Sequence, residues 1–361
     1  MTDTLKHILA KAQQGFALAT AEIKSILELS DPADLQLLFE TARDLRQQNF
    51  GNRIFLYGFV YFSTYCRNSC NFCLYRRDNP AAVRYRKSTA EIIESSQRLA
   101  ESGVHLIDLT MGQDPQIFNN GEKGFNRLLE IIHSVKQNTG LPVMVSAGVL
   151  DEDIIGKLSA AGANWYACYQ ETNNRRLFRQ LRKFQDYDKR LDSKRTAKEH
   201  GLLIEEGLLV GVGETAEDIA DSISAMGNLN ADQVRAMSFI PQKGTPMENF
   251  TSADPLRELL IIALLRLVFP DCLIPASLDV GGHAMLTQKL AAGANVVTSL
   301  IPPGQGLAGV AQCDLNIEDG KRTVAGIKDI LRDNGLEPAT VEEYRSWMDR
   351  RLKTNRLNTK A

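Results

Sequence analysis

The feature of this sequence that most restricts its fold is the regular alternation of short apolar runs with amphipathic segments. Eight apolar runs have the composition of buried strands, at residues 54–62, 104–110, 142–147, 164–170, 202–210, 233–239, 272–278 and 295–300. Helical patterns lie between them, as at residues 88–102, 125–139, 152–161 and 255–269. Strands that alternate with helices form parallel βαβ units. The sequence therefore predicts an α/β protein with a TIM-type (βα)8 barrel, and a doubly wound sheet is the structural alternative.

Helical segments flank the predicted barrel at both ends. Residues 1–50 precede the first apolar run, and Ser30, Asp31 and Pro32 form a helix break and N-cap signal within them. The last residues of the chain are charged and have helical patterns. We therefore expect an N-terminal helical extension (1–50), a barrel (51–313) and a C-terminal helical segment packed on the barrel (314–361).

The composition suits one large cytoplasmic protein. The chain has 361 residues, of which 43% are hydrophobic, and α/β barrels of this size often form a single domain. The net charge of −2 gives no reason to expect a nucleic-acid or membrane partner. The N-terminus lacks a basic stretch followed by an apolar one, as a secretory signal would have. The most apolar stretch is interrupted by Arg266 and is too short to span a bilayer.

Three cysteines lie close together directly after the first predicted strand. The six cysteines of the chain are too few for a disulfide scaffold, and Cys66, Cys70 and Cys73 are spaced C-x3-C-x2-C. Structural zinc sites usually have four ligands, often in two pairs. A [4Fe–4S] cluster held by only three thiolates keeps one iron open for an outside ligand. We therefore expect an iron–sulfur cluster here, and a chance grouping of three cysteines in a loop is the alternative.

The segment YFSTYCRNSCNFCLYRRDN resembles the signature of the radical S-adenosylmethionine (SAM) superfamily, with Phe72 as the aromatic residue before the third cysteine. The resemblance extends over nearly the whole chain, as far as FIPQKGTPM and beyond. It is closest to the biotin synthase-like group, which includes a hydrogenase maturase and the methylornithine synthases of pyrrolysine biosynthesis. The run CNFCLYRRDN is typical of the latter two.

This resemblance implies a specific chemistry. SAM would chelate the open iron, and its reductive cleavage would give a 5′-deoxyadenosyl radical that abstracts a substrate hydrogen. No catalytic residue beyond that cofactor radical is implied. An electron donor such as a flavodoxin or a ferredoxin, and an anaerobic organism, are implied as well. The most specific implication is isomerisation of L-lysine to (3R)-3-methyl-D-ornithine by fragmentation and recombination of a lysine radical, which requires a sealed polar pocket.

Polar residues near the carboxyl ends of the strands are candidates for SAM binding, because barrel sites lie at that end. Glu171 follows the fourth strand, where its carboxylate could pair with the methionyl ammonium, and Tyr169 shares its face. A helix N-cap role for Glu171 is the alternative. The resemblance implies that Arg190, in DYDKRL, pairs with the SAM carboxylate, and that the backbone of the loop at residues 211–215 approaches SAM. The expected SAM contacts are Phe72, Ser146, Tyr169, Glu171, Arg182, Arg190, Ile240 and Gln242.

Three charged residues interrupt or end apolar strands, and each needs a partner if it is buried. They are Asp108, Arg235 and Asp279, and Ser277 shares a strand face with Asp279. An arginine that faces two aspartates suits a zwitterion with a second amine. The resemblance places Arg235, Ser277 and Asp279 where methylornithine synthases bind their amino acid, so these four residues are the expected substrate contacts. An internal ion pair without a ligand is the alternative.

Other functions stay open at this point. Biotin synthase uses an auxiliary cluster inside its barrel, whereas strand parity predicts that Cys168 and Cys272 face outward, and Cys313 lies beyond the last strand. A hydrogenase-maturase-like enzyme that acts on another amino-acid-derived substrate would share the cysteine loop. A metal-binding module without enzymatic activity would hold a metal and leave SAM intact.

Overall fold

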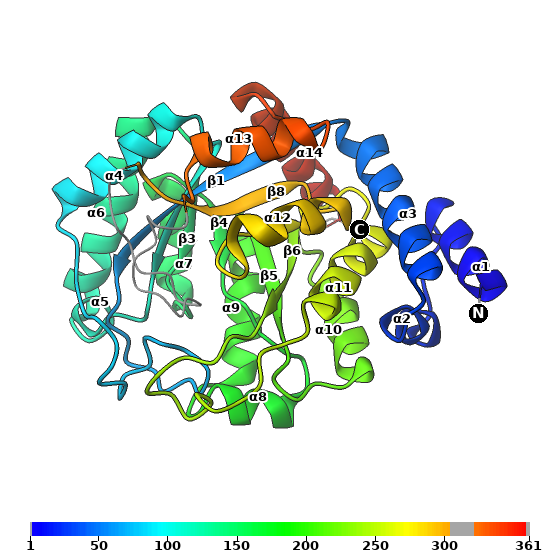
Figure 1. Ribbon diagram of the computed structural model, residues 1–361. Coiled ribbons are helices and arrows are strands. Elements are labelled where there is room, and N and C mark those ends of the chain that lie inside the picture. Colours follow the sequence, from blue (N-terminus) through cyan, green and yellow to red (C-terminus); the bar gives the residue numbers. More distant parts are fainter. Residues whose placement is uncertain (1, 304–320, 359–361) are drawn as a thin grey trace.

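The computed structural model describes residues 2–303 and 321–358, and its centre is a barrel of parallel strands (Figure 1). Eight strands of the described chain pair in the order β6-β5-β4-β3-β2-β1-β8-β7. Strand β6 pairs with the chain just before β7 only at the bridge between Gln233 and Leu273, so the barrel is nearly closed. The strands are β1 (Arg53–Ser63), β2 (Leu106–Met111), β3 (Val143–Ser146), β4 (Ala163–Ala167), β5 (Leu203–Val210), β6 (Gln233–Ser238), β7 (Pro275–Ser277) and β8 (Val296–Leu300). The predicted barrel is thereby confirmed.

Helices alternate with these strands and cover the outside of the barrel (Figure 1). The first of them begins with a capping box between Ser88 and Glu91 and ends at Gly103 in the left-handed conformation. The four helices predicted from the sequence are α4, α6, α7 and α11, and they differ from the prediction only at their ends. The series is α4 (Thr89–Ser102), α5 (Pro115–Phe118), α6 (Gly121–Thr139), α7 (Glu152–Ala161), α8 (Arg175–Leu181), α9 (Tyr187–Glu199), α10 (Ala216–Asn228), α11 (Pro255–Val268) and α12 (Gly282–Ala291).

The N-terminal residues form three helices, α1 (Thr2–Gln13), α2 (Thr20–Leu27) and α3 (Pro32–Phe50), at one side of the barrel (Figure 1). The predicted break is present between α2 and α3. There the Asp31 side chain accepts hydrogen bonds from the backbone of Ala33 at 2.9 Å and Asp34 at 3.2 Å. Apolar residues of all three helices belong to the same core as the outer faces of the strands.

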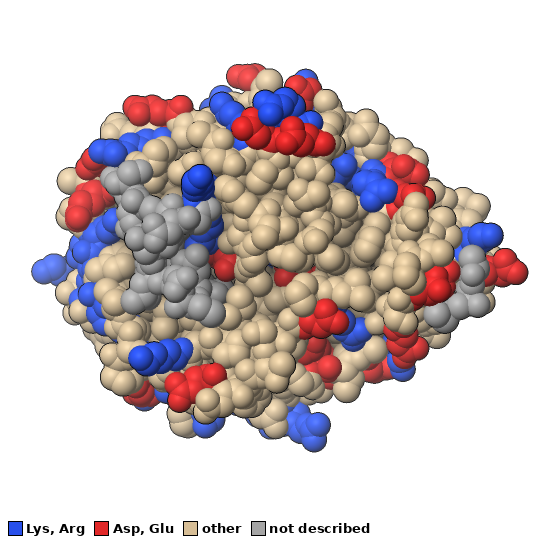
Figure 2. Space-filling view, in the orientation of Figure 1, with Lys and Arg blue, Asp and Glu red and all other residues tan. Residues whose placement is uncertain are grey.

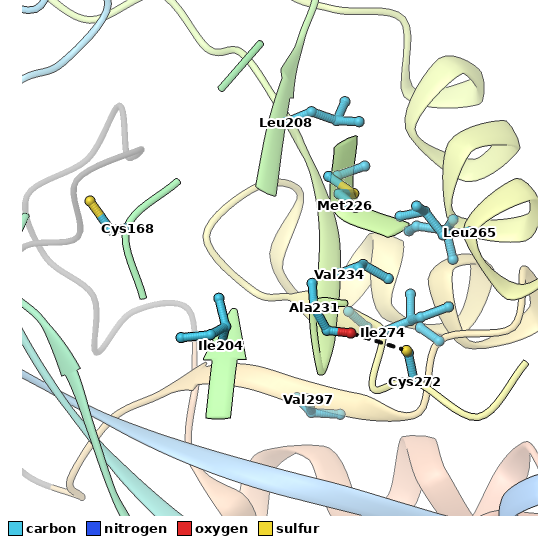
Figure 3. Close-up of a cluster of buried hydrophobic side chains, with 14 of the residues drawn as sticks. Cys168, Ile204, Leu208, Met226, Ala231, Val234, Leu265, Cys272, Ile274 and Val297 are labelled. Carbon is cyan, nitrogen blue, oxygen red and sulfur yellow. Dashed lines mark hydrogen bonds between the residues drawn. The ribbon is translucent and has the colours of Figure 1, made fainter. Parts of the chain in front are cut away.

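Two apolar cores lie on opposite faces of the barrel wall. Along β1, Leu56 and Val60 pack outward against the helices, while Tyr57 and Phe59 belong to a second core inside the barrel. Cys168 and Cys272 both belong to the outer core, and the Cys272 thiol donates to the backbone oxygen of Ala231 at 3.4 Å (Figure 3). Their predicted outward orientation is therefore confirmed. Cys313 lies outside the described residues, as does the proposed domain boundary beside it.

The C-terminal segment closes one end of the barrel. It contains α13 (Val324–Asp333), the short strand β9 (Glu337–Pro338) and α14 (Val341–Asn358). The predicted C-terminal helices are present, and between them the short strand β9 pairs with the beginning of β1. On α14, Trp347 stacks on Trp165 with ring centroids 5.9 Å apart, and the Tyr344 hydroxyl lies 2.7 Å from that of Tyr57. These rings fill the barrel at the amino ends of the strands, so its interior opens toward the opposite end, where α8 lies (Figure 1).

Charged side chains of both signs are mixed on the surface of the described residues. On the face shown in Figure 2, Lys and Arg side chains are interspersed with Asp and Glu side chains. Within residues 2–303 and 321–358, no helix is both long and apolar enough to cross a membrane.

Candidate active site

The loop that follows β1 carries the three clustered cysteines and is held by polar side chains. Arg84 donates to the backbone oxygens of Tyr75 at 3.0 Å and Arg76 at 2.7 Å. Asn79 donates to Leu74 O at 2.8 Å within this loop and to Lys243 O at 2.9 Å in the loop after β6. These bonds fix the shape of the cysteine loop and join it to the region of two expected SAM contacts.

The three cysteine thiols lie close enough to influence one another. Burial, together with the neighbouring Cys70 and Cys66, raises the pKa of Cys73 to about 12, and burial also raises the pKa of Cys66. Ligand cysteines must be deprotonated, so a cationic centre bound here would relieve this cost. The described residues contain no group of three or more Cys, His, Asp or Glu placed to hold a single metal ion. In an iron–sulfur cluster, each thiolate would bind a different iron.

Glu171 is held in a strained backbone conformation beside this loop. Its φ is +68°, and its backbone is bonded to β5 through Gly207 O at 3.1 Å and Leu209 N at 2.9 Å. Arg182 donates to Glu171 Oε1, while Glu171 Oε2 is buried with no hydrogen-bond partner among the described residues. Burial raises the pKa of Glu171, although Arg182 opposes the shift. One carboxylate oxygen thus remains to accept a bond from a ligand.

Two hydrogen-bond routes connect the cysteines to the segment around Glu171. Arg182 Nη1 donates to Cys70 Sγ at 3.5 Å, and its other terminal nitrogen binds Glu171. Gln185 Nε2 donates to Cys70 Sγ at 3.0 Å, and Gln185 Oε1 accepts from Arg190 Nη1 at 3.1 Å. Arg190 Nε in turn donates to Tyr169 O at 2.6 Å. The structure therefore brings Arg182, Arg190, Tyr169 and Glu171 together at the cysteine loop.

A buried ion pair supports the same segment from outside the barrel. Lys194 is fully buried and pairs with Glu206, and its Nζ also donates to Gln170 Oε1 at 2.9 Å. Glu206 Oε1 accepts from the backbone nitrogen of Gln170 at 2.7 Å. Lys194 and Glu206 thereby fix Gln170, the residue between Tyr169 and Glu171.

The remaining expected SAM contacts lie in three places. Phe72 is half-buried, with the Arg182 guanidinium 5.4 Å from its ring centroid, and Ser146 lines the barrel interior. Gln242 is buried and donates to Ile240 O at 3.1 Å, in the loop that Asn79 ties to the cysteine loop.

The loop at residues 211–215 is held by one of its own side chains, and the approach of its backbone to SAM stays a prediction. Glu214 accepts from the backbone nitrogens of Gly211 and Val212, each at 2.9 Å. Within the chain, these two amides are therefore already hydrogen-bonded.

A cavity of about 80 Å³ lies inside the barrel at its open end. It contains all four expected substrate contacts and two of the expected SAM contacts. Its lining is Phe59, Tyr61, Asp108, Thr110, Ser146, Tyr169, Arg235, Met237, Glu258, Ser277, Asp279 and Val280.

Arg235 has a direct acidic partner that the sequence analysis did not single out. Its Nε lies 2.7 Å from Glu205 Oε1, and Tyr169 donates its hydroxyl to Glu205 Oε2 at 2.8 Å. Arg235 Nη2 donates to the Thr298 hydroxyl at 3.1 Å. Burial alone would lower the pKa of Arg235, but Glu205 outweighs it and the pKa is raised. The expected Arg235–aspartate arrangement is therefore incomplete, because the nearest counter-charge is Glu205.

Asp279 is also paired with a residue that the sequence analysis missed. Arg322 Nη1 donates to its Oδ1 at 2.7 Å, and the hydroxyls of Ser299 at 2.6 Å and Ser277 at 3.3 Å donate to its Oδ2. Burial would raise the pKa of Asp279, yet Arg322 and Ser299 hold it below its usual value. Asp279 is consequently ionised, and Arg322 supplies its charge partner.

Asp108 has no such partner. It is 1% exposed, and neither carboxylate oxygen has a well-aligned hydrogen bond within the described chain. Burial and then the charge of Glu205 raise its pKa to about 7, although the nearby Ser146 and Thr110 hydroxyls oppose the shift. Buried acids normally have a counter-charge, so this residue is a candidate to bind a cationic group of a ligand.

Comparison with known proteins identifies the family to which this site belongs. The radical SAM superfamily model matches residues 60–226. The 3-methylornithine synthase of Methanosarcina acetivorans is 42% identical over 343 residues, which are 95% of this chain and 97% of that protein. The [FeFe] hydrogenase maturase subunit of Thermotoga maritima is 31% identical over 280 residues, 76% of this chain and 78% of its own. A crystal structure of methylornithine synthase is 40% identical, with a TM-score of 0.89, and covers 94% of this chain and 99% of its own. The chain therefore belongs to the radical SAM superfamily and, within it, to the family of the 3-methylornithine synthases.

Proposed function

We propose that this protein isomerises L-lysine to (3R)-3-methyl-D-ornithine, with one [4Fe–4S] cluster and SAM as its cofactors. The family relationship supports the reaction and both cofactors. The observation that supports lysine as the substrate is the cavity beside the cysteine loop. Two arginine–acid pairs line or adjoin it, at Arg235 and Asp279, and Asp108 supplies a further acid without a basic partner.

The residues around the cysteine loop fit the cofactors. Cys66, Cys70 and Cys73 would hold the cluster, and when bound the cluster and SAM supply the hydrogen-abstracting radical. Glu171 offers its unpartnered oxygen to the methionyl ammonium, while Arg182 and Arg190 place positive charge for the methionyl carboxylate. The other expected contacts would border the ribose, the methionyl group and the adenine, and they are Phe72, Ser146, Tyr169, Ile240 and Gln242.

The cavity residues would bind and orient the amino acid. Arg235 would bind the carboxylate of lysine, and Asp108 and Asp279, with Ser277, would accept hydrogen bonds from its two ammonium groups. The rings of α14 close the amino end of the barrel, so water cannot enter from that side. Exclusion of water protects the radical fragments until they recombine.

The test is anaerobic incubation of the reconstituted protein with SAM, dithionite and lysine. We expect 5′-deoxyadenosine and a chromatographically distinct isomer with the mass of lysine. Cys70→Ser should abolish both products, whereas Cys272→Ser, a matched change in the outer core, should retain them. Absence of 5′-deoxyadenosine with every amino acid tried would refute an enzyme of this class. Cleavage of SAM with a thiazolidine-type substrate, while lysine stays intact, would instead support a maturase-like reaction.

The cellular setting is part of the same proposal. Reduced iron–sulfur chemistry suits the cytoplasm of an anaerobic cell, and a flavodoxin or ferredoxin would supply the electron. A direct check is whether either protein replaces dithionite in the assay.

A further inference from the structure

The turn between α8 and α9 lies directly over the cysteine loop. Asn71 in that loop donates its backbone nitrogen to Leu181 O at 2.8 Å and its side chain to Gln180 O at 2.7 Å. From the same turn, Arg182 and Gln185 donate to Cys70 Sγ at 3.5 Å and 3.0 Å. Cys70 itself is buried, so these contacts connect a surface turn with the interior thiol.

At the tip of this turn, Phe184 has two unusual properties. Its side chain is 93% exposed, although a single exposed apolar residue is ordinary on a protein surface. Its φ is +63°, a left-handed conformation that is rare for a bulky residue and costs on the order of 1–3 kcal/mol. A ring that lies almost wholly in solvent returns no packing energy to the fold. Backbone strain that no packing within the chain offsets indicates that the Phe184 ring contacts another molecule.

The surface around Phe184 has an excess of unpaired positive charge. Lys183 and Arg179 are exposed, and the described chain offers neither of them an ion pair. Two nearby acids are neutralised, since Lys189 pairs with Asp151 at 2.7 Å and Arg175 pairs with Asp188. Asp186, in the turn itself, has no ion pair in the described chain and accepts hydrogen bonds from the backbone nitrogens of Asp188 at 2.8 Å and Lys189 at 3.0 Å.

A groove runs along the same turn. Its lining includes Arg67, Phe118, Asp151, Phe184, Asp186 and Lys189. Arg67 is exposed, and its guanidinium lies 4.6 Å from the centroid of the Phe118 ring. The groove therefore combines apolar walls with two basic and two acidic side chains beside the cysteine loop, and the excess of positive charge comes from the neighbouring Lys183 and Arg179.

We propose that this turn and groove form the docking surface for an acidic, flavin-carrying electron-transfer protein. The proposal rests on the proposed function, because only a redox-active cluster requires a one-electron donor. One electron leaves the reduced flavin and enters the oxidised cluster, and no bond of this chain forms or breaks. The basic residues complement an acidic partner and accelerate encounter. The Phe184 ring can lie against the exposed aromatic edge of a flavin, which favours a flavin carrier over an iron–sulfur carrier.

Two variants and two matched controls test this surface. Phe184→Gly removes the ring and also relieves the backbone strain, because glycine adopts positive φ readily, so the fold should be kept. Lys183→Glu reverses one charge. Phe16→Ala, an aromatic residue 61% exposed on the N-terminal extension, and Lys328→Glu on α13 make the same kinds of change elsewhere.

The assay compares two reductants on the reconstituted enzyme with SAM and lysine. With a purified flavodoxin as the donor, we expect 5′-deoxyadenosine formation to fall about tenfold in Phe184→Gly and about three- to tenfold in Lys183→Glu. The Lys183→Glu rate should also depend less on salt. With dithionite, both variants should match the wild type, and both controls should match it with either donor.

A binding measurement is independent of turnover. Titration of the oxidised enzyme with oxidised flavodoxin should give a dissociation constant about three- to tenfold larger for either variant. Equal rates and equal affinities in all five proteins would overturn the docking surface. If Phe184→Gly slows 5′-deoxyadenosine formation equally when a [2Fe–2S] ferredoxin is the donor, the assignment of a flavin carrier would be overturned. Failure of the wild type with dithionite would count against the proposed function, while the affinities would still decide the docking surface.

Discussion

Replacement of Asp108 by asparagine should make the ligand-free protein more stable at neutral and alkaline pH. Asp108 lies on β2 inside the barrel, 1% exposed, and its pKa rises from 3.8 to about 7. Because the folded pKa is the higher one, the folded chain keeps a proton between these values that the unfolded chain has released. The contribution of Asp108 is therefore most favourable at low pH and is lost as pH rises through about 7.

The size of the effect follows from the two pKa values. A shift of about three units corresponds to about 4 kcal/mol of destabilisation once the pH exceeds 7. About half of this, roughly 2 kcal/mol, should develop between about pH 5.5 and pH 8. Asparagine has nearly the same shape and no charge, so any offset from its amide is constant over this range. The pH-dependent part of the difference between variant and wild type isolates the carboxylate.

Urea unfolding of both proteins in the same cluster state measures this difference. The free energy of unfolding of Asp108→Asn, relative to wild type, should rise by roughly 2 kcal/mol from about pH 5.5 to about pH 8. A difference that stays constant within about 0.5 kcal/mol would refute the assigned ionisation of Asp108.

Lysine binding tests the same carboxylate through a second quantity. Without a reductant there is no turnover, so calorimetry in buffers of different ionisation enthalpy reports the protons exchanged on binding. An ammonium placed beside Asp108 would ionise it, and at pH 7 about half a proton should leave per lysine bound. Asp108→Asn should abolish this release and weaken binding. Asp34→Asn, at a buried position on α3 outside the cavity, should preserve both, and unchanged proton release in Asp108→Asn would contradict the argument.

Three further substitutions probe other parts of the structure. Arg322→Gln removes the largest influence that opposes burial at Asp279 and should raise its pKa, so KM for lysine should rise about tenfold, and further toward low pH, in steady-state assays. Lys194→Met leaves Glu206 buried without its cation and should cost about 3–5 kcal/mol in urea unfolding. Trp347→Ala removes a stacked ring from the closed end of the barrel and should cost about 3–5 kcal/mol by the same measurement.

The barrel could be predicted from sequence because each of its strands is buried on both faces and forms an apolar run bounded by turn residues. Strand β7 shows the limit of this reasoning. The apolar run at residues 272–278 is longer than the observed strand, Pro275–Ser277. Leu273 makes only one bridge to β6, since the barrel does not close fully there. The apolar pattern predicts which residues are buried. The length of a hydrogen-bonded strand also depends on how close its neighbouring strand lies.

Sequence likewise identifies some of the charged residues of the cavity and misses others. Arg235 and Asp279 stand out because a charge in an apolar run needs a partner, but the sequence does not say which partner. Glu205 lies beside Glu206 on β5, and alternation sends one inward to Arg235 and the other outward to Lys194. Arg322 lies beyond the last barrel strand, and only the folded chain brings it to Asp279. Strand parity could have identified Glu205, whereas Arg322 had no local signal.

The pairing of these charges explains how the cavity could select its substrate. Arg235 is paired with Glu205, Arg322 with Asp279, and Lys289 with Glu258, which leaves Asp108 as the acid without a cation in the described part of the site. An amino acid with two ammonium groups and one carboxylate has a net positive charge and would neutralise it. An analogue with a methyl group in place of the side-chain ammonium would leave Asp108 buried without a counter-charge or protonated. The roughly 4 kcal/mol that Asp108 costs the empty protein above pH 7 is recovered only with a cationic ligand, which permits discrimination of up to about a thousandfold.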